Sequence, residues 1–210
     1  YYEGGSGPWR NGKWIDSFLT VMQAVALEPV VRYWESTGDD EAWGFALALA
    51  EGMLAGLQRN QGDNRILEDG SFLGHIHAHG HAVWGVAHLG ALTGDRRYLD
   101  WARRFYEFVV GTQGTDYGWV AEWVAERRDG GAFNTGRGEV CAVSDMVSIG
   151  AWLARAGYSE YWDWIERTIR NYLREVRFLV TAAYEEEYRR LHGEKAEAGL
   201  AMMRELEGGF

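Results

Sequence analysis

Cysteine and proline are nearly absent from this sequence, and each scarcity limits the fold. The 210 residues include one cysteine, Cys141, and two prolines, Pro8 and Pro29. A single thiol cannot form an intrachain disulfide, so a disulfide framework is excluded, and we expect a reducing, cytoplasmic compartment. Because proline breaks helices, its scarcity favours a helical chain. Pro29 falls inside the first predicted helix, where we expect it to kink that helix.

Positive charge and long apolar runs are also scarce. Lys and Arg number 21 against 31 Asp and Glu, which gives a net charge of −10. A negative net charge disfavours binding to nucleic acid and to anionic membranes, so we expect neither as a partner. No run approaches the ~20 apolar residues of a membrane span. The chain begins Tyr1-Tyr2 and ends Gly208-Gly209-Phe210, so we expect it to be a fragment.

What the chain does contain is a helical pattern with repeated punctuation. Apolar residues recur in steps of three and four, which predicts an all-α fold. Glycine stands at 38, 94 and 157, and Asp39 and Asp95 follow the first two. A left-handed glycine that ends one helix and an aspartate that caps the next explain each turn. The expected helical hairpins cover residues 15–59, 75–111 and 138–177, and a charged amphipathic helical segment covers 178–210.

The connections between hairpins are much longer than the turns within them. Since successive helices alternate in direction, the connections 58–73 and 111–138 lie at the same end of the bundle, together with the aromatic stretch 1–14. Functional residues favour such loops. Two-helix repeats build solenoids or closed toroids. A six-hairpin toroid with this period needs roughly 350 residues. We therefore predict one domain over 1–210 that forms part of an (α/α)6 toroid, with three to four hairpins.

Ionisable side chains on two of these hairpins fall at one axial level. His75, His77 and His81 lie 19, 17 and 13 residues before Gly94, and Glu139, Cys141 and Asp145 lie 18, 16 and 12 before Gly157. At a rise of 1.5 Å per residue, the positions of the two sets along the helix axis differ by only a few ångströms. Trp84 extends the histidine face by one turn. We expect at least one of these histidines to be functional; the alternative is that they are packing or solvated residues.

Glu139 and Cys141 have two interpretations. A carboxylate and a thiolate two residues apart can ligate one Zn²⁺, which needs two further ligands. Alternatively, Cys141 is a small buried side chain beside a capping glutamate. Asp145 follows one turn later, either as a carboxylate of the site or as a hydrogen-bond partner between helices.

The loop from 114 to 123 places two carboxylates, Asp116 and Glu122, among Tyr117, Trp119 and Trp123. A carboxyl group desolvated by indole rings suits a general acid. Aromatic faces beside polar groups also suit a neutral sugar. The alternative is that these rings only cover the end of the bundle.

Three segments of the chain form a recognisable set: Gly80-His81, the Thr-Gly-Asp-Arg-Arg-Tyr-Leu turn at 93–99, and Gly-Glu-Val-Cys-Ala at 138–142. Together they resemble the catalytic toroid of β-L-arabinofuranosidase-like six-hairpin glycosidases, glycoside hydrolase family 127 and its relatives. The resemblance covers about residues 15–177. It implies an (α/α)6 toroid in which a Glu-x-Cys pair and further cysteines hold zinc, a cysteine acts as nucleophile, and a separate glutamate acts as acid/base.

Carried over to this chain, the resemblance implies that Glu139 and Cys141 are the zinc-ligating pair, His81 contacts substrate, and Glu122 is the acid/base. The chain departs from the family in lacking the later cysteine pair, and Asp145 lies in an unusual continuation of the Glu-x-Cys motif. Either the nucleophile lies beyond residue 210, or a carboxylate route through Asp145, Asp116 or Glu122 replaces it.

The expected function is a glycoside hydrolase that removes a terminal sugar from a glycan with retention of configuration. The alternatives are a non-catalytic helical-repeat module that binds glycan or protein, and a polysaccharide lyase. Besides carbohydrate, the expected partner is the rest of a toroid or another copy of the chain. The predicted catalytic residues are Glu122 and Asp145. The predicted substrate-binding residues are His75, His77, His81, Trp84, Tyr117, Trp119 and Trp123. The predicted metal ligands are Glu139 and Cys141, which make up only part of the ligand set of a Zn²⁺ ion.

Overall fold

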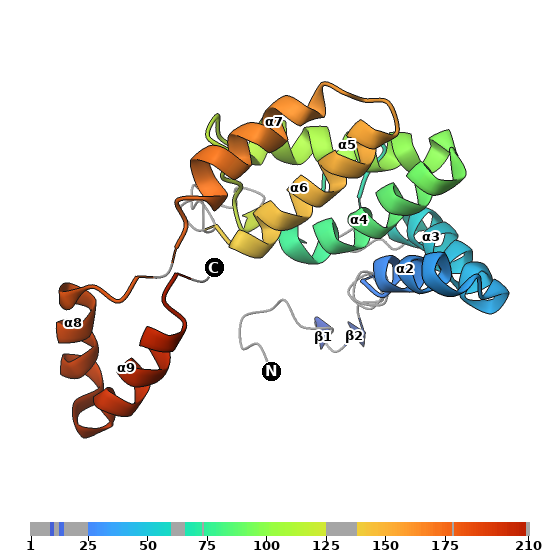
Figure 1. Ribbon diagram of the computed structural model, residues 1–210. Coiled ribbons are helices and arrows are strands. Elements are labelled where there is room, and N and C mark those ends of the chain that lie inside the picture. Colours follow the sequence, from blue (N-terminus) through green and yellow to red (C-terminus); the bar gives the residue numbers. More distant parts are fainter. Residues whose placement is uncertain are drawn as a thin grey trace.

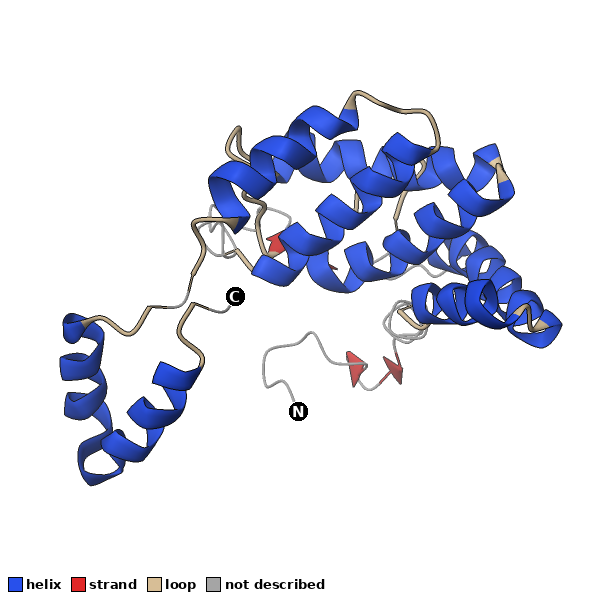
Figure 2. Ribbon diagram, viewed as in Figure 1, coloured by secondary structure: helices blue, strands red, loops and turns tan. Residues whose placement is uncertain are grey.

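The computed structural model describes residues 9–10, 13–14, 25–59, 66–72, 74–124, 138–177 and 179–208. Residues 15–24, at the start of the first predicted hairpin, and parts of both long connections lie outside the described residues. The predicted all-α fold is confirmed (Figures 1 and 2). The helices are α2 (Leu27–Thr37), α3 (Asp40–Arg59), α4 (Ile76–Thr93), α5 (Arg96–Gln113), α6 (Val140–Arg155), α7 (Tyr161–Thr168, continued by the π-helical turn Ile169–Leu173), α8 (Ala182–His192) and α9 (Ala196–Glu205).

The predicted turn chemistry is confirmed at the ends of these helices. Gly38, Gly94 and Gly157 have φ angles of 71°, 70° and 113°, in the left-handed region that favours glycine. The Asp39 carboxylate accepts a hydrogen bond of 2.8 Å from the Glu41 amide, and Asp95 accepts one of 2.8 Å from the Arg97 amide. Each aspartate therefore satisfies an amide that the new helix leaves without a partner.

Pro29 lies in the first turn of helix α2 and not in the interior of a helix, where we expected it. Helix α2 begins at Leu27, so Pro29 is the third residue of its first turn. The amides of a first turn have no carbonyl partner within the helix, and a residue without an N–H costs nothing there. The prediction of a kink was wrong because it set the start of the helix too early.

The first six described helices form two layers. Helices α2, α4 and α6 run in one direction, and α4 packs against both of the others (Figure 1). Helices α3, α5 and α7 run back and pack on this first layer. Helix α4 is buried on nearly every side, which explains its apolar and glycine-rich sequence. At Gly85 an added Cβ would come within 2.8 Å of Leu27 Cγ, so glycine permits the close approach of α2 and α4.

Four short strands accompany the helices in the part of the chain that the structure describes. Strand β1 (Trp9–Arg10) pairs with β2 (Lys13–Trp14), and β3 (Gly74–His75) pairs antiparallel with β4 (Trp123–Val124). The β3–β4 ladder ties the aromatic loop to the start of α4, and the Ile76 amide adds a hydrogen bond of 2.9 Å to the Glu122 carbonyl. Strands of two residues have no detectable period, so the sequence pattern did not predict them.

Helices α8 and α9 form a hairpin that stands apart from the other helices (Figure 1). The predicted break after His192 is present, because α8 ends there and Gly193 has a φ of 54°. Among the described residues, no helix has the length and apolar character that crossing a membrane would need.

Candidate functional site

The candidate site lies where α4 and α6 begin. His75 is the N-cap residue of α4, and Glu139 is the N-cap residue of the parallel helix α6. The two side chains meet, with 2.8 Å between His75 Nε2 and Glu139 Oε2. The shared axial level expected from the spacing to the turn glycines is confirmed by this contact.

His75, Glu122 and Glu139 form the first group of side chains, which we call the His75 cluster. One ligand atom from each residue lies within 4.8 Å of the others. An ionised carboxylate only accepts hydrogen bonds, so His75 Nε2 donates to Glu139. The Cys141 thiol donates to the same Glu139 oxygen at 3.3 Å. The Trp123 indole donates to Glu122 Oε1 at 2.9 Å, and its ring lies 4.9 Å from the His75 ring.

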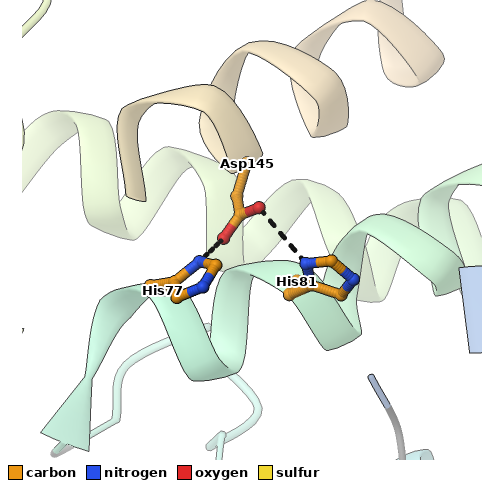
Figure 3. A group of neighbouring side chains, drawn as sticks. All are labelled: His77, His81 and Asp145. Atoms are coloured by element: carbon orange, nitrogen blue, oxygen red, sulfur yellow. Dashed lines mark hydrogen bonds and ion pairs between the residues drawn. The ribbon is translucent and has the colours of Figure 1, made fainter. Parts of the chain in front are cut away.

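His77, His81 and Asp145 form the second group, the His77 cluster (Figure 3). Asp145 projects from α6 between the two rings of α4. His77 Nδ1 lies 2.7 Å from Asp145 Oδ2, and His81 Nδ1 lies 3.6 Å from Asp145 Oδ1. Only 5% of the Asp145 side chain is exposed, against 36% for His77 and 31% for His81. Asp145 therefore does join the two helices, one of the roles expected for it.

Two side chains of the site have shifted pKa values. The hydrogen bond to Asp145 raises the pKa of His77 above its usual 6.5, against the opposing effect of partial burial. Burial, with the neighbouring Glu139 carboxylate, raises the pKa of Cys141 to about 11. At neutral pH Cys141 is therefore a protonated thiol that donates to Glu139, and without a metal it is a poor nucleophile.

The predicted aromatic residues divide into two groups. The Trp84 ring lies 5.3 Å from the His81 ring, so Trp84 and Trp123 stand at opposite ends of the row formed by His75, His77 and His81. Trp119 is half-buried against the core. Tyr117 is exposed in the loop before it.

His88 also differs from the pattern of the α4 histidines. The seven-residue spacing from His81 predicts that it continues the row, but His88 is fully buried and stacks on Trp152 with ring centroids 3.9 Å apart. The helix turns His88 toward the packed interior, so it belongs to the core.

The zinc set of the resembling family does not fit this chain. Glu139 and Cys141 are neighbours as the resemblance implies. However, that set is completed by further cysteines, and Cys141 is the one cysteine of the 210 residues. We therefore derive no chemical step through a cysteine-rich zinc centre.

Three successive helical pairs with parallel first helices define part of an α/α toroid. No family model matches the chain, and no curated protein matches it. Among solved structures, the chain is similar to an inactive variant of the alpha-1,6-mannanase GH76A of Salegentibacter sp. HEL1_6 in complex with alpha-1,6-mannotetrose. The TM-score is 0.60 at 17% identity, and the match covers 81% of this chain and 50% of that chain. That mannanase is an (α/α)6 toroid, and the chain has the fold of a part of it. This chain thus spans about half the length of its structural neighbour.

Proposed function

We propose that the chain carries the catalytic carboxylates of a retaining glycoside hydrolase, with Glu122 as acid/base and Glu139 as nucleophile. The observation that supports this most directly is that carboxylate oxygens of the two residues lie within 4.8 Å of each other. Retaining glycosidases separate their two carboxyl groups by about 5–5.5 Å, whereas inverting enzymes need about 6.5–9.5 Å. The short separation therefore favours direct attack by a carboxylate.

The hydrogen bonds around each carboxylate fit its proposed role. His75 and Cys141 both donate to Glu139, which orients its carboxylate for attack on the anomeric carbon. Glu122, oriented by the Trp123 indole, gives its proton to the glycosidic oxygen as that bond breaks. Glu139 then holds the sugar as an ester. Glu122 takes a proton from water, and the resulting hydroxide equivalent releases the sugar and restores Glu139.

The surroundings suit a neutral sugar. The Trp123 ring stands beside the carboxylate pair, and the Trp84 ring stands at the far end of the histidine row. Aromatic faces pack on the C–H faces of sugars, while imidazole groups exchange hydrogen bonds with hydroxyls. The family resemblance suggests arabinofuranosides, and the structural neighbour's bound mannotetrose suggests mannosides. Both belong in the first substrate panel.

The roles of the two glutamates can be separated with azide on aryl glycosides, whose good leaving groups need little acid assistance. We expect Glu122→Ala to lower kcat on unactivated glycosides by about 10²–10⁴-fold. Azide should restore activity to Glu122→Ala and give a glycosyl azide of retained configuration, because it attacks the covalent intermediate. In Glu139→Ala azide replaces the nucleophile, and the product should have inverted configuration.

The matched control is Glu166→Ala, which removes an exposed carboxylate on α7 and should leave turnover unchanged. Wild-type turnover with both Glu122→Ala and Glu139→Ala would contradict the assignment. Glycan binding without turnover in the wild type, unaffected by Glu122→Gln, would instead identify a binding module. Release of an unsaturated uronate, detected by its ultraviolet absorbance, would identify a lyase.

The zinc-thiolate route is the alternative to a carboxylate nucleophile, and Cys141→Ser tests it. If Glu139 is the nucleophile, the serine hydroxyl still donates to it, and activity should fall only modestly. Loss of activity equal to that of Glu139→Ala, together with loss of bound zinc, would support the thiolate route.

A further inference from the structure

The His77 cluster takes no part in the bond-breaking steps proposed for Glu122 and Glu139, and its geometry suggests a role of its own. We propose that His77, His81 and Asp145 bind one divalent transition-metal ion, Zn²⁺ or an ion of similar preference. The proposal does not depend on the hydrolase assignment, because it concerns different side chains and its test measures metal directly.

The distances are close to those of a coordination sphere. Zinc binds nitrogen and carboxylate oxygen at about 2.0–2.2 Å, so the ligand atoms of a tetrahedral site lie about 3.3–3.5 Å apart. The two nitrogen-to-oxygen distances here, 2.7 Å and 3.6 Å, lie on either side of that value. All three ligand atoms lie within 4.8 Å of one another. Small rotations of the rings and carboxylate are enough to bring them around one ion.

The backbone fixes the three ligands in advance. His77 and His81 are four residues apart on α4, so their side chains share one face of the helix. Asp145 comes from the facing helix α6 and points between them (Figure 3). Gly80 makes room for it, because an added Cβ there would lie 3.1 Å from Asp145 Cβ and 3.2 Å from its Oδ2. A site built on two packed helices holds its ligands more rigidly than a loop does.

The charge and exposure of the cluster also favour a metal. Asp145 is almost completely buried, and a buried carboxylate needs compensating positive charge or hydrogen bonds. His77 supplies one hydrogen bond, while His81 at 3.6 Å is too far for another. A divalent ion bound to both rings and to the Asp145 carboxylate would supply that positive charge. The rings remain about one-third exposed, so water can complete the coordination.

The donor set selects the kind of ion. Two imidazoles and one carboxylate suit zinc and similar transition metals, whereas Mg²⁺ and Ca²⁺ prefer oxygen ligands alone. Three protein ligands leave at least one coordination position for water. Catalytic zinc sites have this arrangement, whereas structural zinc sites have four protein ligands. The site lies beside the His75 cluster, since the His75 and His77 ring centroids are 5.9 Å apart.

The test is metal titration of the chelator-treated 210-residue chain, with Co²⁺ absorbance as the spectroscopic probe and Zn²⁺ as the competitor. We expect one equivalent of Co²⁺ to bind and to give the visible absorption of Co²⁺ in a four- or five-coordinate site. Added Zn²⁺ should displace the Co²⁺ and abolish that absorption. His81→Ala and Asp145→Asn should each weaken Zn²⁺ binding by at least tenfold. Gly80→Ala should weaken it several-fold without removing a ligand, because the added methyl group crowds the Asp145 carboxylate. Circular dichroism checks that each variant is folded.

Two matched controls locate the site. His192→Ala removes an exposed histidine on α8, and Glu139→Gln removes a carboxylate of the neighbouring His75 cluster; both should bind Zn²⁺ like the wild type. The proposal is overturned if the wild type binds no stoichiometric metal. It is also overturned if Glu139→Gln abolishes binding while folded His81→Ala and Asp145→Asn retain it, since the metal would then belong to the His75 cluster.

Discussion

His88 is a titratable side chain in the core, and its surroundings make stability depend on pH. Its ring stacks on Trp152, and its Nε2 lies 3.1 Å from a carboxylate oxygen of Glu35. Glu28 also faces the ring, and Arg32 of the same helix pairs with Glu28. Burial lowers the pKa of His88 below its usual 6.5, although the charges of Glu35 and Glu28 oppose that shift. The folded protein therefore favours neutral His88.

This shift predicts a loss of stability in weak acid. The unfolded chain takes up a proton at His88 as the pH falls below about 6.5, but the folded chain resists it. The contribution of His88 to stability is thus present above that pH and is lost as the pH falls toward the lower, folded pKa. When the pH is lowered from 7.5 to 5.5, the urea concentration at the unfolding midpoint should fall more in the wild type than in His88→Gln. Equal falls would contradict this account of His88.

Individual residue contacts were only partly predictable from sequence. The spacing to Gly94 and Gly157 was enough to bring His75 and Glu139 to one level, because helices have a fixed rise. The same spacing could not tell that His88 turns into the core, since α4 is apolar on nearly every side and has no clear exposed face.

At the scale of elements, the approach of α2 to α4 determines how tightly the first layer packs. Gly85→Ala would place a methyl group 2.8 Å from Leu27 Cγ and from the Glu28 amide nitrogen. Because backbone must move, we expect a destabilisation of about 1–3 kcal/mol in urea denaturation. Gly44→Ala in α3 is the matched control, since no described atom outside the adjoining backbone of α3 lies within 4 Å of the added Cβ. It should stabilise by about 0.5–1 kcal/mol, the ordinary gain of alanine over glycine in a helix. Equal effects of the two substitutions would show that the contact is unimportant.

The elements that build the site differ in how well sequence revealed them. Capped helices such as α5, which Asp95 begins, follow from local rules and were predicted. The β3–β4 ladder was not, because pairing between residues about fifty positions apart leaves no local signal in two-residue strands. Yet this ladder brings Glu122 to Glu139, so the composition of the His75 cluster needed the structure.

At the scale of the whole molecule, the parallel first-layer helices explain why the site forms where it does. Helices α2, α4 and α6 begin at the same end, so their N-cap residues and the described parts of the long connections gather there (Figure 1). The chain spans half of its structural neighbour, and the match is one of fold. The repeat period and turn chemistry were enough to predict that partial toroid, because both are local and regular. Helices α8 and α9 lie apart from these layers, and the sequence predicted only a charged amphipathic helical segment there, without its position.

The central claim is that Glu122 and Glu139 act as a closely spaced catalytic pair, and the stereochemistry of the first product tests it most directly. The substrate is an arabinofuranoside or mannoside of the panel that the wild-type chain hydrolyses. Proton NMR then reports the anomeric configuration of the released sugar before mutarotation. The account predicts retained configuration, with turnover lost in Glu122→Ala and Glu139→Ala and kept in Glu166→Ala. Inverted configuration, or retained configuration with turnover unaffected in both catalytic variants, would contradict it.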